Sequence, residues 1–126
     1  MEVTNIFSAL IQAPVDPDAG IRLIKMTGDT AISIYAAEID PNTELLPHYH
    51  LKGIETYQVL AGKGLMKTGE LKGESFEWTN SFEAIEGDCF SIPEKVVHQI
   101  INHMDEKLRL IFSCPESHVG SDRYFV

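Results

Sequence analysis

The stretch His48-Tyr49-His50-Leu51-Lys52-Gly53-Ile54-Glu55 decides how this chain is interpreted, because it brings three candidate metal ligands close together in sequence. Alternate side chains of a strand point to the same face, with their Cα atoms about 7 Å apart, so His48 and His50 can converge on one ion. The residues between His50 and Glu55 let the chain turn and begin a neighbouring strand, where the carboxylate could supply a third ligand. A His-x-His pair alone is weak evidence, so the interpretation depends on the downstream sequence.

Further candidate residues follow this stretch along the chain. Gly62 follows Glu55 after six intervening residues, and a second group consists of Gly87, Pro93, His98 and Asn102. His98 lies in the apolar stretch Val97–Ile101, so we expect its side chain on the face of a sheet rather than in a loop.

These positions resemble the two motifs of the cupin family, G-x5-H-x-H-x3,4-E-x6-G and G-x5-P-x-G-x2-H-x3-N. The resemblance spans residues 42–102, about half of the chain. Asn42 and Lys95 stand where the motifs have glycine. Asn adopts left-handed backbone readily, whereas Lys in that conformation costs on the order of 1 kcal/mol. Neither departure removes a metal ligand.

The resemblance implies an all-β fold, the double-stranded β-helix or jelly-roll-like barrel, as a single cupin domain over residues 1–126. It also implies one divalent metal ion per chain, held inside the barrel by His48, His50, Glu55 and His98. Three imidazoles and a carboxylate suit Fe, Mn, Ni or Zn, and the ligands do not choose among them. For Asn102 the resemblance suggests a structural hydrogen bond.

The rest of the sequence agrees with a β fold, because nine Gly and six Pro cut it into short apolar or alternating stretches. We expect Gly62-Lys63-Gly64 to form a hairpin loop. The N-terminal arm, residues 1–20, is expected to form either a strand or a short helix around Thr4–Gln12. The expected strands are Ile21–Met26, Thr30–Ile39, Leu46–His50, Ile54–Leu60, Leu65–Thr68, Ser75–Thr79, Phe82–Glu86, Asp88–Ile92, Val97–Ile101 and Lys107–Cys114.

Other residues are assigned by their place relative to the four candidate ligands. Tyr57 shares the parity of Glu55, so it is expected to face the barrel interior, either as core packing or as a catalytic group that positions substrate. Ile100 shares the parity of His98 and is expected to line the same pocket. We expect His103 and His118 to be solvent-exposed. The aromatic residues between the motifs are expected to form barrel wall or a dimer contact, with ligand stacking as the alternative: Phe76, Trp78 and Phe82.

Charge and composition limit the partners and the compartment. The formal net charge of -9 opposes binding to nucleic acid or to anionic membranes. No apolar run approaches the 18 or so residues of a transmembrane helix, and we see no signal peptide, so a cytoplasmic location is the default expectation. Cys89 and Cys114 lie in strand-like apolar runs and are expected to be buried, reduced thiols. The apolar N-terminal residues Ile6, Phe7, Leu10 and Ile11 lead us to expect a homodimer.

Two functions remain open from the sequence. The first is a metal-dependent enzyme acting on a small oxygenated metabolite, as a dioxygenase, isomerase, lyase or decarboxylase. The second is a metal-containing module that binds or senses a small molecule without turnover. We favour the enzyme, because no fused DNA-binding or catalytic domain is present to be regulated.

Overall fold

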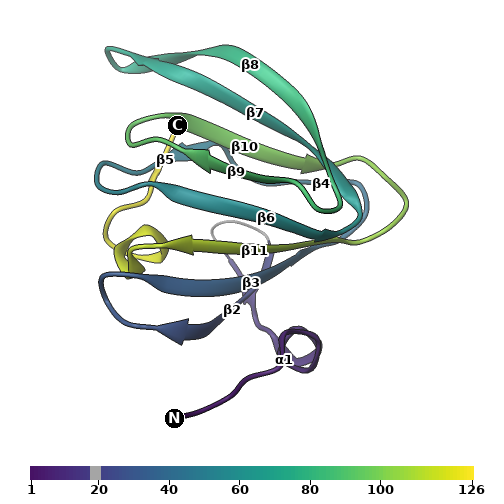
Figure 1. The fold of residues 1–126 in the computed structure, drawn as a ribbon. Coiled ribbons are helices and arrows are strands. Elements are labelled where there is room, and N and C mark those ends of the chain that lie inside the picture. The colour runs from purple at the N-terminus through teal and green to yellow at the C-terminus, as the bar shows by residue number, and fades with distance from the viewer. Residues whose placement is uncertain (18–20) are drawn as a thin grey trace.

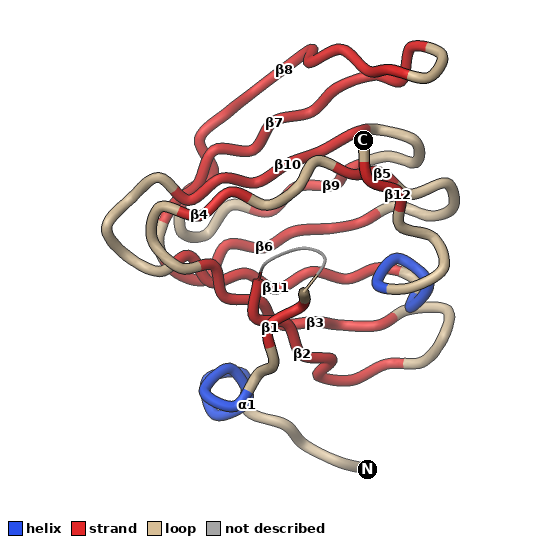
Figure 2. Tube along the Cα trace, turned by 180° about the vertical axis from the view of Figure 1, so that it is seen from behind, coloured by secondary structure: helices blue, strands red, loops and turns tan. Residues whose placement is uncertain are grey.

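Two antiparallel sheets face each other in the computed structural model, which describes residues 1–17 and 21–126 (Figure 1). The first sheet has the strand order β1 (Val15–Asp16), β2 (Ile21–Gly28), β3 (Ser33–Ile39), β11 (Leu108–Cys114), β6 (Glu55–Ala61) and β9 (Cys89–Ile92). The second has the order β12 (Tyr124–Phe125), β5 (His48–Tyr49), β10 (Val97–Asn102), β7 (Lys63–Lys72) and β8 (Ser75–Ile85), and β4 (Thr43–Glu44) also pairs with β10. The view from behind shows the same two layers, with the long β7–β8 hairpin at one end (Figure 2).

The main core fills the space between the sheets. Alternate side chains of the strands point inward, which is the pattern expected for sheets that pack face to face. Ile39 and Leu108, neighbours in the β3–β11 pair, are completely buried, and Met66 on β7 faces them from the second sheet's side of the core. The candidate metal ligands are also buried, with His48 and His98 on the second sheet and Glu55 on the first.

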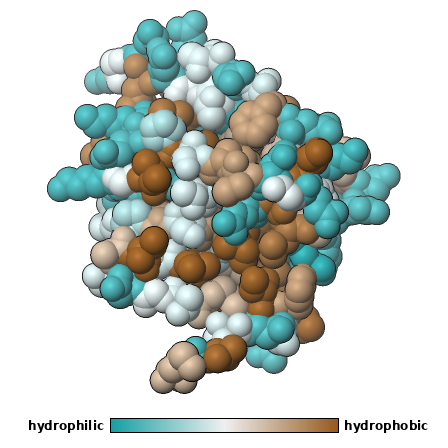
Figure 3. All heavy atoms as spheres, viewed as in Figure 1, coloured by the Kyte–Doolittle hydropathy of each residue, from teal (hydrophilic) through white to brown (hydrophobic). Residues whose placement is uncertain are grey.

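A short helix, α1 (Ile6–Gln12), covers part of the outer face of the first sheet. Asn5 caps it, because its side chain accepts a hydrogen bond from the backbone N–H of Ser8. Leu10 packs with Met26 in a second, smaller core cluster. The helical alternative for the N-terminal arm is thus correct, while residues 18–20 of that arm lie outside the described residues. Figure 3 shows apolar residues in brown and tan across the lower half of the face, down to the end where α1 lies.

Three sequence predictions about this framework are wrong. Gly62 does not belong to a hairpin, because β6 and β7 are in different sheets and the chain crosses between them there. The two strands expected around Ser75–Thr79 and Phe82–Glu86 form the single strand β8, with a bulge where Thr68 pairs with Asn80 and Gly69 with Trp78. Cys89 is exposed, because its side chain is on the outward face of the sheet opposite the exposed Gln58, whereas Cys114 is buried as expected.

None of the helices in the described part of the chain is long and apolar enough to span a membrane.

Candidate metal centre

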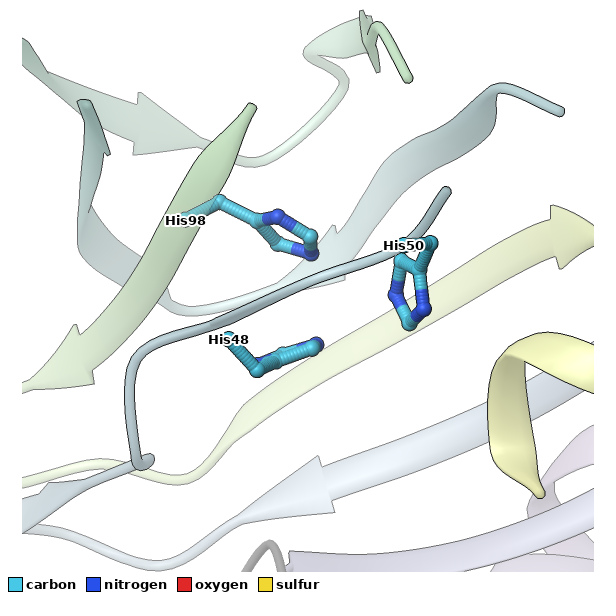
Figure 4. A group of neighbouring side chains, drawn as sticks. All are labelled: His48, His50 and His98. Atoms are coloured by element: carbon cyan, nitrogen blue, oxygen red, sulfur yellow. The ribbon is translucent and has the colours of Figure 1, made fainter. Parts of the chain in front are cut away.

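The pairing of strand β5 with strand β10 places His48 beside His98. His48 is the direct cross-strand partner of His98, and their ring centroids are 4.3 Å apart. His50 follows β5 two residues later, and its ring centroid is 5.0 Å from that of His48. Figure 4 shows the three rings turned toward a common space between the two strands and the segment that carries His50.

The two motif positions that lack glycine adopt left-handed backbone. Asn42 has φ 56° and Lys95 has φ 66°, so both turns keep the conformation for which glycine is favoured. A hydrogen bond accompanies the strained backbone at Lys95: the N–H of Lys95 donates to the backbone oxygen of His50 at 2.7 Å. This bond ties the turn before β10 to the segment that carries the second histidine.

Backbone carbonyls fix the tautomer of all three imidazoles. Nδ1 of His48 lies 3.1 Å from the oxygen of Leu46, and Nδ1 of His98 lies 3.0 Å from the oxygen of Val96. Nδ1 of His50 lies 2.6 Å from the oxygen of Asp122. A carbonyl only accepts, so each Nδ1 carries a proton and donates, and in the neutral ring the lone pair is on Nε2. Metal-binding histidines are commonly oriented in this way.

Two of these Nε2 atoms are buried without a hydrogen-bond partner among the described residues: those of His50 and His98. Burial, with the neighbouring His98 adding to it, lowers the pKa of His48 to about 3. Burial likewise lowers the pKa of His98. At neutral pH these two imidazoles are therefore neutral, which is the form that binds a metal ion.

Glu55 begins β6 in the opposite sheet and is only 4% exposed. Its Oε2 lies 2.7 Å from Nε2 of His50 and 3.2 Å from Nδ1 of His118. Burial raises the pKa of Glu55, but hydrogen bonding by His118 and the adjacent imidazoles outweigh it and hold the pKa well below the usual value. Oε2 of Glu55 and Nε2 of His50 thus face each other at 2.7 Å, where either a shared proton or a bound cation would hold them together.

The candidate ligands form two groups that share His50. His48, His50 and His98 present ligand atoms within 4.8 Å of one another, and so do His50, Glu55 and His118. Both groups could hold a metal ion. The four residues predicted from the sequence are therefore brought to one region, with Glu55 joined to the three histidines through His50.

The prediction that His118 is solvent-exposed is wrong. It lies in the short 3-10 helix η1 (Glu116–Val119) and is 2% exposed, because this helix folds back over the segment between His50 and Glu55. Close packing confirms the contact: a Cβ on Gly53, which has φ 84°, would lie 2.7 Å from Pro115. No motif spacing marks His118 in the sequence, so only the fold reveals it.

Asp122, in the same C-terminal segment, was also missed. Its carboxylate accepts hydrogen bonds from the backbone N–H groups of Leu51 at 2.7 Å and Lys52 at 3.0 Å, while its carbonyl accepts from His50. The C-terminal segment thus fastens the loop that carries the candidate ligands. By contrast, His103 is exposed, as predicted.

A cavity of about 40 Å³ adjoins the candidate ligands. His48, His50 and Glu55 line it, together with the two further residues predicted for it, Tyr57 and Ile100. The remaining walls are mainly apolar side chains, whereas Phe76, Trp78 and Phe82 are not part of the described lining. The space has room for only a few atoms of about the size of water.

The Tyr57 hydroxyl keeps its proton in this setting. Burial raises the pKa of Tyr57 well above its usual value, and the Glu55 carboxylate raises it further. Its ring stacks on Phe90 with centroids 5.3 Å apart and lies 5.9 Å from Phe112, so core packing is one of its roles. The phenol is a potential hydrogen-bond donor at the cavity wall.

The family model described as Cupin domain matches residues 35–114, which is more than half of the chain. This chain belongs to the cupin family. Its two antiparallel sheets are those of the cupin double-stranded β-helix, so the fold class expected from the sequence is confirmed.

Solved structures show the same fold at low sequence identity. A Cupin 2 conserved barrel domain protein from Salinispora arenicola CNS-205 has a TM-score of 0.69 and 16% identity, with 96% of this chain and 93% of that chain covered. CapF, solved with the inhibitor 3-isopropenyl-tropolone, has a TM-score of 0.71 and 18% identity over 90% of this chain, which spans only 33% of CapF. A recombinant oxalate oxidase in complex with glycolate has a TM-score of 0.67 and 17% identity, with 98% of this cupin and 59% of the oxidase covered.

Proposed function

We propose that this cupin binds one divalent metal ion through His48, His50, Glu55 and His98 and is a metal-dependent enzyme acting on a small oxygenated molecule. One observation carries the metal: among the described residues the buried Nε2 of His98 has no hydrogen-bond partner, and the buried Nε2 of His50 faces another candidate ligand atom, Oε2 of Glu55, at 2.7 Å. A buried polar atom left unpaired costs about 1–3 kcal/mol. A cation at this place would offset that cost.

The chemistry of the donor set fits such an ion. Neutral imidazoles and one ionised carboxylate suit Fe, Mn, Ni or Zn in the divalent state, and the donors do not select one of them. When bound, such an ion supplies Lewis acidity toward an oxygen-bearing ligand, and iron adds chemistry with dioxygen.

The chain's own groups support catalysis on a small substrate. Tyr57 presents a protonated phenol at the cavity wall, where it can donate to a substrate oxygen that gains negative charge. Apolar side chains such as Ile100 and Leu110 form much of the remaining lining and exclude water. The low dielectric of this lining strengthens any such hydrogen bond.

The size of the cavity limits the substrate class. About 40 Å³ admits a compact molecule of few heavy atoms, or one end of a longer one. The oxalate oxidase named above was solved with glycolate, a hydroxy acid of this size. Because that relative is only 17% identical, it supports a small oxygenated acid as the first class to test, without selecting dioxygenase, isomerase, lyase or decarboxylase chemistry.

The direct test is a substrate screen with protein loaded with Fe(II), Mn(II), Ni(II) or Zn(II). Small hydroxy acids, enolisable acids and diketones are offered, and oxygen consumption and product mass are recorded together. Tyr57→Phe removes the hydroxyl but keeps the ring. Tyr35→Phe is the matched control, because Tyr35 is another buried tyrosine that stacks on Phe112 without lining the cavity.

We expect turnover by at least one loaded form, and a drop of roughly ten-fold or more in rate for Tyr57→Phe at equal metal content. Tyr35→Phe should keep the parent rate. If no loaded form converts any compound while several compounds raise the thermal stability by mass action, a metal-containing binding module replaces the enzyme.

A further inference from the structure

His118 reaches the candidate metal centre from a part of the chain far from both cupin motifs. Its ring is 2% exposed, and Nδ1 lies 3.2 Å from Oε2 of Glu55. Nε2 lies 2.6 Å from the backbone oxygen of Lys52. The side chain therefore spans from the carboxylate to the loop that precedes it.

Both nitrogens of His118 face oxygen atoms that only accept. The Lys52 oxygen is a backbone carbonyl 2.6 Å from Nε2, and the Glu55 oxygen belongs to a carboxylate 3.2 Å from Nδ1. Each nitrogen satisfies its partner only by donating, so neither offers a lone pair to a metal ion. His98 differs in this respect, because its buried Nε2 has no hydrogen-bond partner in the described part of the chain.

The His118 ring also supports a neighbouring imidazole. It stacks on the ring of His50 with centroids 3.9 Å apart and an interplanar angle of 3°. His50 is held from its other side by the hydrogen bond from Nδ1 to the oxygen of Asp122. One C-terminal segment thus restrains two of the proposed ligands.

We infer that His118 is a positioning residue of the metal centre: its Nδ1–H donates to Glu55 and holds the carboxylate in place beside His50. The inference rests on the metal site proposed above. The Glu55 side chain turns about three bonds, and a charge-assisted hydrogen bond from a buried donor fixes it more firmly than a neutral one does. Loss of such an outer partner typically weakens metal binding by roughly 10–100-fold.

Two variants separate the donor to Glu55 from the donor to Lys52. His118→Asn places an amide nitrogen where Nδ1 stood, so it can still donate to Glu55. His118→Gln places its amide near the position of Nε2, so it can reach the Lys52 carbonyl but lacks the donor at Nδ1. Both variants remove the ring, so loss of stacking on His50 is common to the pair.

The measurements are the dissociation constant of Co(II), from competition with a chelator, and the visible spectrum of the Co(II)-loaded protein. The spectrum reports the number and geometry of the ligands, which a general loss of stability would not change. We expect His118→Gln to bind Co(II) roughly 10–100-fold more weakly than the parent, with a shifted spectrum. We expect His118→Asn to retain most of the parent affinity and its spectrum.

Equal affinity and an unchanged spectrum for all three proteins would overturn the positioning role. Weak binding by both variants, with spectra showing one nitrogen ligand fewer, would also overturn it and make His118 a ligand. If the parent protein itself binds no Co(II), the proposed metal site is wrong, and the inference about His118 fails with it. Folding of each variant is checked by circular dichroism before loading.

Discussion

His48 and His98 are direct partners on β5 and β10, with ring centroids 4.3 Å apart. The strand β5 has only two residues, so its pairing with β10 on one side and β12 on the other sets the place of His48. Each imidazole is then oriented by a carbonyl two residues before it, Leu46 or Val96. Strand pairing and these two backbone carbonyls therefore set the geometry of the pair.

Removal of Asn102 should destabilise the fold without acting on the metal centre. Its side-chain amide donates to the oxygens of Ile39, Asp40 and Glu106, and its Oδ1 accepts from Met104 N–H. Asn102→Ala leaves these buried groups unpaired, so we expect a loss of about 2–3 kcal/mol in the free energy of unfolding. Urea denaturation measures this loss.

Asn80→Ala serves as the control for that experiment. Asn80 is exposed, and its side chain accepts only from the adjacent N–H of Ser81, so the free energy of unfolding should change by less than about 0.5 kcal/mol. Similar losses of unfolding free energy for the two variants would show that the buried hydrogen bonds of Asn102 stabilise the fold no more than the exposed one of Asn80.

Stability should depend on pH through Glu38. Burial raises the pKa of this carboxyl, but hydrogen bonds from Lys107 at 3.1 Å and Arg109 at 3.0 Å outweigh it, so the pKa is lowered. A lowered pKa adds stability that is fully present above the unfolded value, near 4.5, and is lost as the pH falls through the folded value. Glu38→Gln should cost about 1 kcal/mol at pH 7, since both cations are partly exposed.

The pH series is read as the difference between parent and variant in urea denaturation. This difference should shrink as the pH falls below about 4.5, because the parent carboxylate then takes up the proton. Glu70→Gln is the control, because the Glu70–Lys72 pair is well exposed and should contribute almost nothing. A difference that stays constant down to acid pH would show that the charge of Glu38 does not matter.

The homodimer predicted from the apolar N-terminal arm remains a proposal. On α1, Leu10 is buried, whereas Phe7 is 58% exposed and Ile11 is 82% exposed. These two side chains offer an apolar surface that a second copy could cover. Light scattering coupled to a size-exclusion column should give a mass near twice 14.1 kDa.

The double variant Phe7→Ser with Ile11→Ser should shift the dimer toward the monomer by at least ten-fold in its dissociation constant. A monomer at all concentrations for the parent protein would refute the dimer. A dimer that the double variant leaves unchanged would place the interface elsewhere.

Much of the fold was accessible from the sequence because strand alternation and turn residues are local signals. The approximate places of β2, β3, β6, β9, β10 and β11 were predicted, and so was left-handed backbone at Asn42. The crossing of the chain between sheets at Gly62 was not, because a glycine-rich turn has the same local chemistry whether or not the flanking strands pair. Exposure of Cys89 follows from its parity with the exposed Ser91 rather than with the buried Ile92, a local signal that the apolar character of the stretch obscured.

The candidate site divides in the same way. His48, His50, Glu55 and His98 could be predicted as ligands because strand geometry and motif spacing are visible along the chain, and the structure brings the four together. His118 and Asp122 were missed because they act from a tail with no periodic pattern, and they reach the site only when that tail folds back. Partners that come together through tertiary structure alone need coordinates to be seen.

The measurement that tests the central claim most directly is the metal content per chain of His98→Ala beside that of His103→Ala. Circular dichroism first shows that both variants are folded. Both are then loaded with Mn(II), Fe(II), Ni(II) or Zn(II), desalted and analysed by inductively coupled plasma mass spectrometry. His98 presents a buried Nε2 to the site, whereas His103, five residues later, is exposed. We expect close to one ion per chain for the parent and for His103→Ala, and far less than one for His98→Ala. Full metal content in His98→Ala would contradict this expectation.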